Sequence, residues 1–324
     1  MLFGVRNAVA QDPLFSQFFS SPFTINPSLA GHLYGDWRVL CNVRNQWSGP
    51  TDPYTTEVIS FDTKLLSKHM SKNNVLGFGA MFINDQSLGG AFKSDYASLN
   101  FSYSITLDEE GQQHIGAGLG AIYGYRHVDF SRLTFPEQFA SEGFNANLPT
   151  GETGLTNMKS YFSTTAGLLY SYTGDNTNFD IGIAGFHFNT PRQTFANNVN
   201  EYLSPRYVIH SNLESFLNDH LILNANAIYQ TQASTNFWVV GGALGYIIST
   251  DADATIVNAG LWYRGNDAII PYLGLSHQAL QFGITYDVTT SALNDAAISP
   301  KTWELFFIIR SPNKANHTIP CPWK

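Results

Sequence analysis

The sequence predicts an all-β protein, namely a transmembrane antiparallel up-and-down β-barrel of about fourteen strands. Three observations predict it. Apolar and polar residues alternate almost from end to end, the alternating runs are long, and the connections between runs fall into a short set and a long set. Composition agrees, because the chain is 44% hydrophobic and 14% aromatic but only 13% charged, whereas a soluble domain is about a quarter charged.

The composition argues against a helical membrane protein. Mean hydropathy is −0.11, and the longest uncharged apolar stretch, 237–248, is too short and too rich in glycine to cross a bilayer as a helix. A barrel needs no such stretch, since only alternate residues of its strands meet lipid. The net charge of −8 comes with no basic stripe for phosphates, so no nucleic-acid partner is expected.

Residues 1–10 are interpreted as the remainder of a signal peptide. Ala8-Val9-Ala10 has the small-x-small pattern of a cleavage site and follows a short apolar stretch. The mature chain is then expected to begin at Gln11. A disordered soluble N-terminus is the alternative for these residues.

The N-terminal periplasmic segment, 11–36, precedes the first expected strand and is too apolar for a free tail. We expect it to pack under or into the periplasmic mouth of the barrel, or to bind a periplasmic partner. Its candidate contact residues are Asp12, Phe15, Phe18 and Asn26.

Alternation within 97–107 is typical of the whole chain. Its apolar row is Ala97, Leu99, Phe101, Tyr103, Ile105 and Leu107, and its polar row is Ser98, Asn100, Ser102, Ser104 and Thr106. A soluble sandwich also alternates, but its strands centre near five or six residues. A tilted strand that crosses a membrane needs about ten, and the expected strands reach that length.

The barrel is expected over 37–311, followed by a periplasmic tail, 312–324. Its expected strands are 37–47, 54–64, 74–84, 92–107, 112–127, 159–173, 178–188, 204–217, 221–231, 236–249, 254–264, 268–277, 279–289 and 302–311.

The connections predict an orientation. Those after even-numbered strands are short and polar, such as 108–111 and 174–177, whereas the longest, 130–158 and 189–203, follow odd-numbered strands. Outer-membrane barrels have short periplasmic turns and longer external loops. An even strand count then places both termini in the periplasm.

Glycine is frequent inside strands, as in Gly116-x-Gly118-x-Gly120. Glycine there permits bends and close backbone approach in a curved wall. The run lacks the strand-to-helix context and full spacing of a nucleotide loop, so no phosphate site and no cofactor are expected.

No candidate catalytic residue or metal ligand set emerges. The histidines are scattered, and no nucleophile motif of the G-x-S-x-G kind accompanies them. His187 and His210 would face each other across a long loop near one rim, but isolated exposed histidines are commoner than metal ligands. The chain is therefore not expected to be an enzyme.

Charged residues on strand rows are expected to point into the lumen, because charge on the lipid face costs a few kcal/mol at the midplane. The candidates are Arg38, Arg44, Glu304 and Arg310. Two interpretations remain open. One is a polar lumen with internal ion pairs, and the other is a pore or plug site that holds a partner segment.

The long loop, 129–157, carries many apolar residues although it faces outside. Phe130, Phe135, Phe139 and Phe144 are its candidate partner-binding residues. Exposed apolar residues in such number indicate a protein contact or a plug that folds inward. We expect this loop and 189–203 to contact an exported protein.

Several motifs, taken in order, resemble the PorP/SprF family of type IX secretion system outer-membrane proteins of the Bacteroidota. The similarity spans most of the chain, although the final Trp323-Lys324 departs from the family ending. The motifs are Gln11-Asp12-Pro13-Leu14-Phe15-Ser16-Gln17-Phe18, Asn26-Pro27-Ser28-Leu29-Ala30-Gly31, Arg44-Asn45-Gln46-Trp47, Leu261-Trp262-Tyr263-Arg264, Asp267-Ala268, Pro271-Tyr272-Leu273-Gly274, Ile284-Thr285-Tyr286-Asp287-Val288-Thr289, Trp303-Glu304-Leu305 and Cys321-Pro322.

The resemblance implies a non-enzymatic role in the secretion and gliding machinery. One kind of member works with the periplasmic ring of the system, and the other supports export or surface anchoring of an adhesin-like cargo through its C-terminal domain. The implied partners are such a cargo and periplasmic secretion and gliding subunits, besides membrane lipid and lipopolysaccharide. The alternatives are a passive porin or solute channel and a barrel hydrolase.

Overall fold

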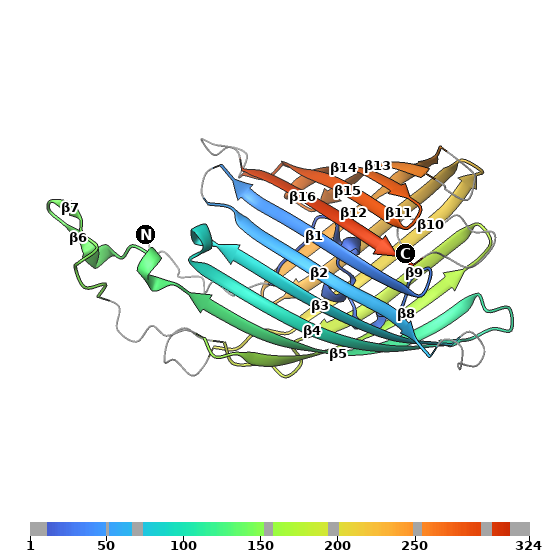
Figure 1. Ribbon diagram of the computed structural model, residues 1–324, viewed down its shortest axis with the longest axis horizontal. Helices are drawn as coiled ribbons and strands as arrows, with labels where there is room; N and C mark the ends of the chain where they lie inside the picture. The colour runs from blue at the N-terminus through green and yellow to red at the C-terminus, as the bar shows by residue number, and fades with distance from the viewer. Residues whose placement is uncertain are drawn as a thin grey trace.

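The chain forms a closed antiparallel β-barrel in the computed structural model, which describes residues 12–49, 52–66, 74–151, 158–193, 201–248, 255–292 and 300–311 (Figure 1). Within those residues fourteen strands follow one another around the barrel in chain order, and the first strand pairs with the last. The predicted fold class is confirmed. The barrel strands are β1 (Trp37–Ser48), β2 (Tyr54–Leu65), β3 (Val75–Ser87), β4 (Phe92–Thr106), β5 (Gln113–Val128), β8 (Tyr161–Thr173), β9 (Thr177–Phe186), β10 (Arg206–Asn218), β11 (Leu221–Gln232), β12 (Thr235–Ile247), β13 (Thr255–Arg264), β14 (Ala268–His277), β15 (Leu280–Thr289) and β16 (Lys301–Arg310).

The two faces of each strand have the expected chemistry. In β4, Leu99, Phe101 and Tyr103 are exposed on the outside, while the residues between them are buried inside. The outward rows are apolar because they meet lipid, and the inward rows carry the polar and charged side chains. The alternation that predicted the strands therefore also fixes which side chains line the lumen.

The two rims of the barrel differ in their connections. One rim carries short turns, such as 107–112, 174–176 and 278–279. The other carries the long connections, including 129–160, whose described part projects well away from the barrel and bears a small hairpin (left in Figure 1). The elements of this part are η5 (Phe130–Arg132), η6 (Pro136–Gln138), β6 (Phe139–Ala140) and β7 (Gly143–Phe144).

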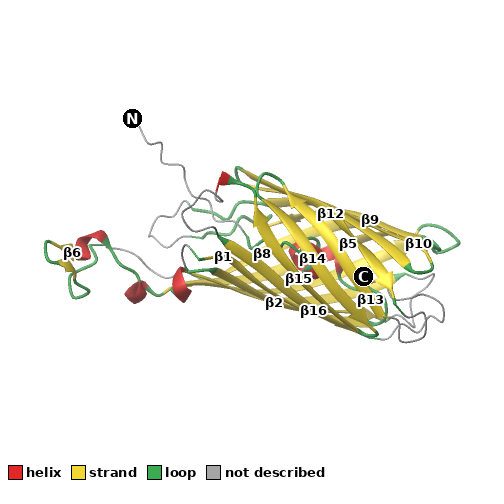
Figure 2. Ribbon diagram, turned by 90° about the horizontal axis from the view of Figure 1, so that it is seen from above, coloured by secondary structure: helices red, strands yellow, loops and turns green. Residues whose placement is uncertain are grey.

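The N-terminal segment, defined here as residues 12–36, lies inside the barrel (Figure 2). It contains three short 3-10 helices, η1 (Phe18–Ser20), η2 (Pro22–Thr24) and η3 (Pro27–Leu29). Proline begins two of them, where its fixed φ is favourable and its missing N–H costs nothing. Phe15, Phe18, Phe23 and Ile25 are each at most 6% exposed, so the lumen gives this apolar segment the burial that it needs.

The N-terminal segment runs the length of the lumen. At the short-turn rim, the Asp36 backbone N–H donates to Ser311 Oγ over 2.6 Å. At the long-connection rim, the Asp12 N–H donates to Gln232 Oε1 over 3.1 Å. The segment was expected to pack under or into the periplasmic mouth, or to bind a periplasmic partner, and not to reach the opposite rim. That expectation is corrected, because contacts suited to its side chains are spread along the whole lumen.

Two expectations at the chain ends fall on residues that the structure does not describe. The signal-peptide remnant, 1–10, and the tail, 312–324, both lie outside the described residues. The first and last described residues, Asp12 and Ser311, lie at opposite rims. In the described part of the chain, no helix is long and apolar enough to cross a membrane.

Candidate functional site

The N-terminal end of the segment, at Asp12, is held by a buried polar cluster at the long-connection rim. The Asp12 carboxylate lies 2.8 Å from His187 Nε2 and 3.1 Å from Arg206 Nε. A second hydrogen bond, of 2.7 Å, joins His187 Nδ1 to Ser163 Oγ on β8. Burial alone would raise the pKa of Asp12, but the charges of Arg206 and His187 outweigh it and hold that pKa well below its usual range.

A second cluster holds the backbone that follows. The N–H groups of Ser16 and Gln17 donate to the two carboxylate oxygens of Glu304, over 2.7 and 3.0 Å. Ser16 Oγ donates to Asp287 over 2.8 Å, and Asp287 also accepts from Arg264 over 2.7 Å. Two successive backbone N–H groups of the segment thus find hydrogen-bond acceptors in one carboxylate, as they would otherwise find them in a neighbouring strand.

Apolar contacts fix the middle of the segment on one wall. The Phe19 ring lies 5.7 Å from Trp262 and 6.1 Å from Phe306, centroid to centroid. Tyr272 stacks on Phe306 at 6.1 Å with an interplanar angle of 8°. Trp262, Tyr272 and Phe306 are almost fully buried, so this part of the lumen is a packed aromatic core.

The η3 turn presses against the opposite wall. Asn26 caps it by accepting from the Ser28 N–H over 2.9 Å, and Asn26 Nδ2 donates to the Leu168 carbonyl on β8 over 3.0 Å. A Cβ at Gly118 of β5 would lie 2.3 Å from Ser28 N, and one at Gly167 would lie 2.1 Å from Asn26 Oδ1. Glycine is required at Gly118 because the backbone of the turn touches the wall, and at Gly167 because the Asn26 side-chain amide occupies the place of a Cβ.

The C-terminal end of the segment, near Asp36, is bound to the short-turn rim. Asp62, which pairs with Arg38 on the wall at 3.0 and 3.1 Å, also accepts from the Gly31 N–H over 3.3 Å. His32 Nε2 lies 3.0 Å from the Asp180 carboxylate, and Asn178 donates to Tyr34 Oη over 2.8 Å. Together with the two polar clusters and the wall contacts of Phe19 and η3, these contacts anchor the segment along its full length.

The four predicted lumen residues, Arg38, Arg44, Glu304 and Arg310, all lie on inward rows and are buried. Arg44 pairs with Asp287 at 3.3 Å and donates to the Leu14 carbonyl. Arg310 donates to Gln281 over 2.5 Å. Arg44 and Glu304 thus contact both the wall and the N-terminal segment.

The predicted partner-binding residues fall into two groups. Asp12, Phe15, Phe18 and Asn26 are in contact with the lumen of this same barrel. The loop residues are outside: Phe139 and Phe144 face each other across β6 and β7 at 5.4 Å, exposed by 60% and 46%. Phe130 and Phe135 are partly buried.

Sequence reasoning missed the partners of Asp12. His187 and His210 were expected to face each other, but His187 binds Asp12, whereas His210 Nε2 lies 3.1 Å from Asn26 Nδ2. Single lumen-facing residues such as Ser163 and Arg206 carry no local motif. Their only sequence signal is a charged or polar residue on an inward row.

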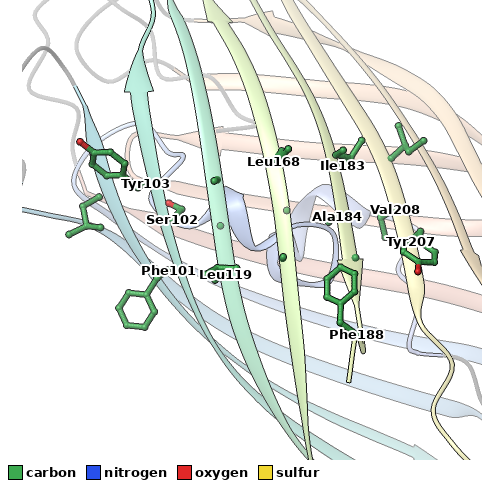
Figure 3. Close-up of a pocket in the computed structure, with 17 residues that line it drawn as sticks. Phe101, Ser102, Tyr103, Leu119, Leu168, Ile183, Ala184, Phe188, Tyr207 and Val208 are labelled. Atoms are coloured by element: carbon green, nitrogen blue, oxygen red, sulfur yellow. The ribbon is translucent and has the colours of Figure 1, made fainter. Parts of the chain in front are cut away.

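The outside of the barrel wall has an apolar groove of about 860 Å³ (Figure 3). It crosses β4, β5, β8, β9 and β10 and reaches Leu76 on β3. Two outward rows border it, two residues apart on each strand. The first is Phe101, Leu119, Ala166, Gly185 and Tyr207, and the second is Tyr103, Ala117, Leu168, Ile183 and Ile209. Phe188 lies at its end beside Tyr207.

Fold and lumen together define a class: an outer-membrane β-barrel whose own N-terminal segment occupies its lumen. A model of the family described as type IX secretion system membrane protein PorP/SprF matches residues 7–309. The chain belongs to that family, which consists of secretion-system membrane proteins and not of enzymes. No curated protein matches the chain.

Solved structures share the fold at low sequence identity. The toluene transporter TodX of P. putida is similar with a TM-score of 0.52 and 10% identity, over 90% of this chain and 93% of that one. A FadL homologue of Pseudomonas aeruginosa has a TM-score of 0.50 and 9% identity, over 87% and 91% of the two chains. The CymD monoaromatic hydrocarbon channel has a TM-score of 0.50 and 10% identity, over 91% and 94%.

Proposed function

We propose that this protein is a non-enzymatic docking barrel of the type IX secretion and gliding machinery. It would support export or surface anchoring of an adhesin-like cargo and contact periplasmic subunits of the system. The long-connection rim would face the cell surface and the short-turn rim the periplasm, as in other outer-membrane barrels. Family membership implies partners in the secretion machinery, and the cargo role is our inference.

One observation carries this proposal. The lumen is occupied by the N-terminal segment, which reaches from η3 against β5 and β8 to Phe19 against Trp262 on β13. A barrel whose interior is packed in this way presents its rims and loops to partners. The exposed Phe139 and Phe144 pair, held away from the wall, is the contact that we assign to the cargo.

Replacing both rings tests this assignment. Phe139→Ala with Phe144→Ala should strongly reduce the amount of cargo on the cell surface, while the barrel still shows its heat-dependent shift on a semi-native gel. Glu142→Gln, between the two strands of the hairpin, is the matched control and should leave cargo display unchanged. Normal display by the double variant would contradict the assignment.

A passive porin or solute channel is the competing function. It requires an open path through the lumen, whereas the spaces found beside the N-terminal segment include cavities of only about 30, 60 and 300 Å³. A large stable conductance of the purified protein in a planar bilayer would favour the porin.

A further inference from the structure

The apolar groove on the outer wall is continuous with the surface that meets the membrane. Its two bordering rows face away from the lumen, and large members of both rows, such as Phe101, Leu119 and Ile183, are about half exposed or more. No charged side chain lines it. Figure 3 shows the labelled side chains of the two rows standing apart on the outside of the strands. The groove is therefore part of the lipid-facing surface.

The depth of the groove comes from side-chain size. Ala117 and Ala166 occupy outward positions on two adjacent strands, where the larger members of the two rows are Leu, Ile, Phe or Tyr. On the next strand, the Phe188 ring covers Gly185, since a Cβ there would lie 2.3 Å from it, and this ring closes that end of the groove. Between the two rows lie the inward positions Ser102, Gly118, Gly167, Ala184 and Val208, which place no side chain on the outer face. The floor is thus bare backbone.

The dimensions of the groove restrict what it can hold. Two rows that lie two residues apart on a strand are separated by about 7 Å, since a strand rises about 3.3 Å per residue. An α-helix with side chains is about 10–12 Å wide and does not fit between them. Across the strands from β3 to β10, five spacings of about 4.8 Å give a length of about 24 Å. One leaflet of the hydrocarbon core is about 15 Å thick.

We propose that the groove binds one acyl chain of a membrane lipid, laid obliquely across the strands. Its length accommodates a chain that spans one leaflet, its width excludes a helix, and its volume of about 860 Å³ lies within the usual range for ligand sites, about 300–1,000 Å³. An apolar cavity stays dry, and an empty one leaves its lining without contacts. A flexible acyl chain can make those van der Waals contacts, and it needs no hydrogen-bond partner.

Filling the groove tests the proposal. The full chain is reconstituted in nanodiscs of palmitoyl-oleoyl phosphatidylethanolamine. The protein is then released from the nanodiscs in the mass spectrometer, and native mass spectrometry counts the lipid molecules that stay bound to it. Ala166→Trp replaces a small member of the first row by an indole that fills the groove, and it should lower the bound fraction about tenfold or more. Thr164→Trp, on the same face of β8 but outside the groove, is the matched control and should retain lipid like the wild type.

Equal lipid retention by Ala166→Trp and the wild type would overturn the proposal. A second measurement does not depend on the folding of that variant. A photo-crosslinking phenylalanine analogue at Leu168, activated in native membranes, should give an adduct of lipid mass. An adduct of protein mass at that position would assign the groove to a protein partner and overturn the lipid site.

Discussion

At the scale of single residues, buried carboxylates of the wall bind the N-terminal segment and also accept hydrogen bonds from other side chains of the wall. Glu304 accepts from the N–H groups of Ser16 and Gln17 and from Asn42 Nδ2 over 2.8 Å. Asp287 accepts from Ser16 and from two arginines. The sequence showed that Arg44 and Glu304 face inward, since charge avoids lipid. It did not show that Glu304 meets Ser16, 288 residues away, because no local pattern encodes such a contact.

Glu304→Gln should weaken the binding of the N-terminal segment, although the side chain keeps almost the same size and shape. One oxygen becomes an NH₂ that faces existing donors, so at least one buried N–H loses its partner at a cost of about 1–3 kcal/mol. The unfolding midpoint in urea, measured in lipid vesicles, should fall accordingly. Glu109→Gln, an exposed carboxylate in the 107–112 turn, is the control and should change little. Equal midpoints for the two variants would contradict a role of Glu304 in holding the segment.

Asp12 gives a pH dependence. Its pKa is lower in the folded protein than in the unfolded chain, where it is about 3.9. Its contribution to stability is therefore complete above about pH 4 and declines as the pH falls toward the folded pKa. Asp12→Asn removes the contribution at every pH. The difference in melting temperature between wild type and variant should be smaller at about pH 3 than at about pH 5; an equal difference at the two pH values would contradict it.

At the scale of elements, the strands follow from the sequence and the N-terminal segment does not. The expected strand 268–277 coincides with β14, and the others differ at each end by at most a few residues. β9 ends at Phe186 and not at 188 because His187 adopts a φ of 60°. Period-two alternation marks each strand locally, whereas the path of a segment without periodicity depends on distant partners.

Gly118→Ala should displace the η3 turn from the wall. The added Cβ would lie 2.3 Å from Ser28 N and 2.5 Å from the Pro27 carbonyl carbon, both of them backbone atoms. Such overpacking costs about 1–3 kcal/mol. Hydrogen exchange at 26–30 should accelerate, and the unfolding midpoint should fall.

Gly116→Ala is the matched control for that variant. It lies on the same strand and face as Gly118, two residues away, and its Cβ would meet neighbours only at 3.5 Å or more, an ordinary contact. Its exchange rates and midpoint should match the wild type. Similar damage from both substitutions would point to a general loss of strand flexibility and not to the turn.

At the scale of the whole molecule, fourteen strands enclose more space than wall side chains alone fill. Barrels of about eight strands are filled by their own side chains, and those of sixteen or more leave a channel. In this barrel, residues 12–36 and the aromatic cluster around Trp262 occupy the interior. The motifs in the sequence indicated the family. The choice between a docking barrel and a pore rests on the occupied lumen, which the sequence alone did not predict.

Deleting residues 12–33 should open the lumen. In a planar bilayer the wild type is expected to be silent, whereas the deletion variant should conduct ions steadily. We also expect the variant to lose cargo display while remaining a heat-modifiable barrel with a lowered melting temperature. Absence of conductance by a folded deletion variant would show that side chains of the wall close the lumen unaided.

The path of the N-terminal segment has a consequence for how the molecule is assembled. The seam that closes the barrel joins β1 to β16, the first and last strands. We expect it to form last, because β16 is the last of the barrel strands in chain order. Until β16 arrives, the sheet is open along that edge, and residues 12–36 can enter sideways. After closure the same residues would have to thread from one mouth to the other past Trp262 and Gly118. The segment is therefore enclosed during biogenesis, and the final strand completes the wall around it.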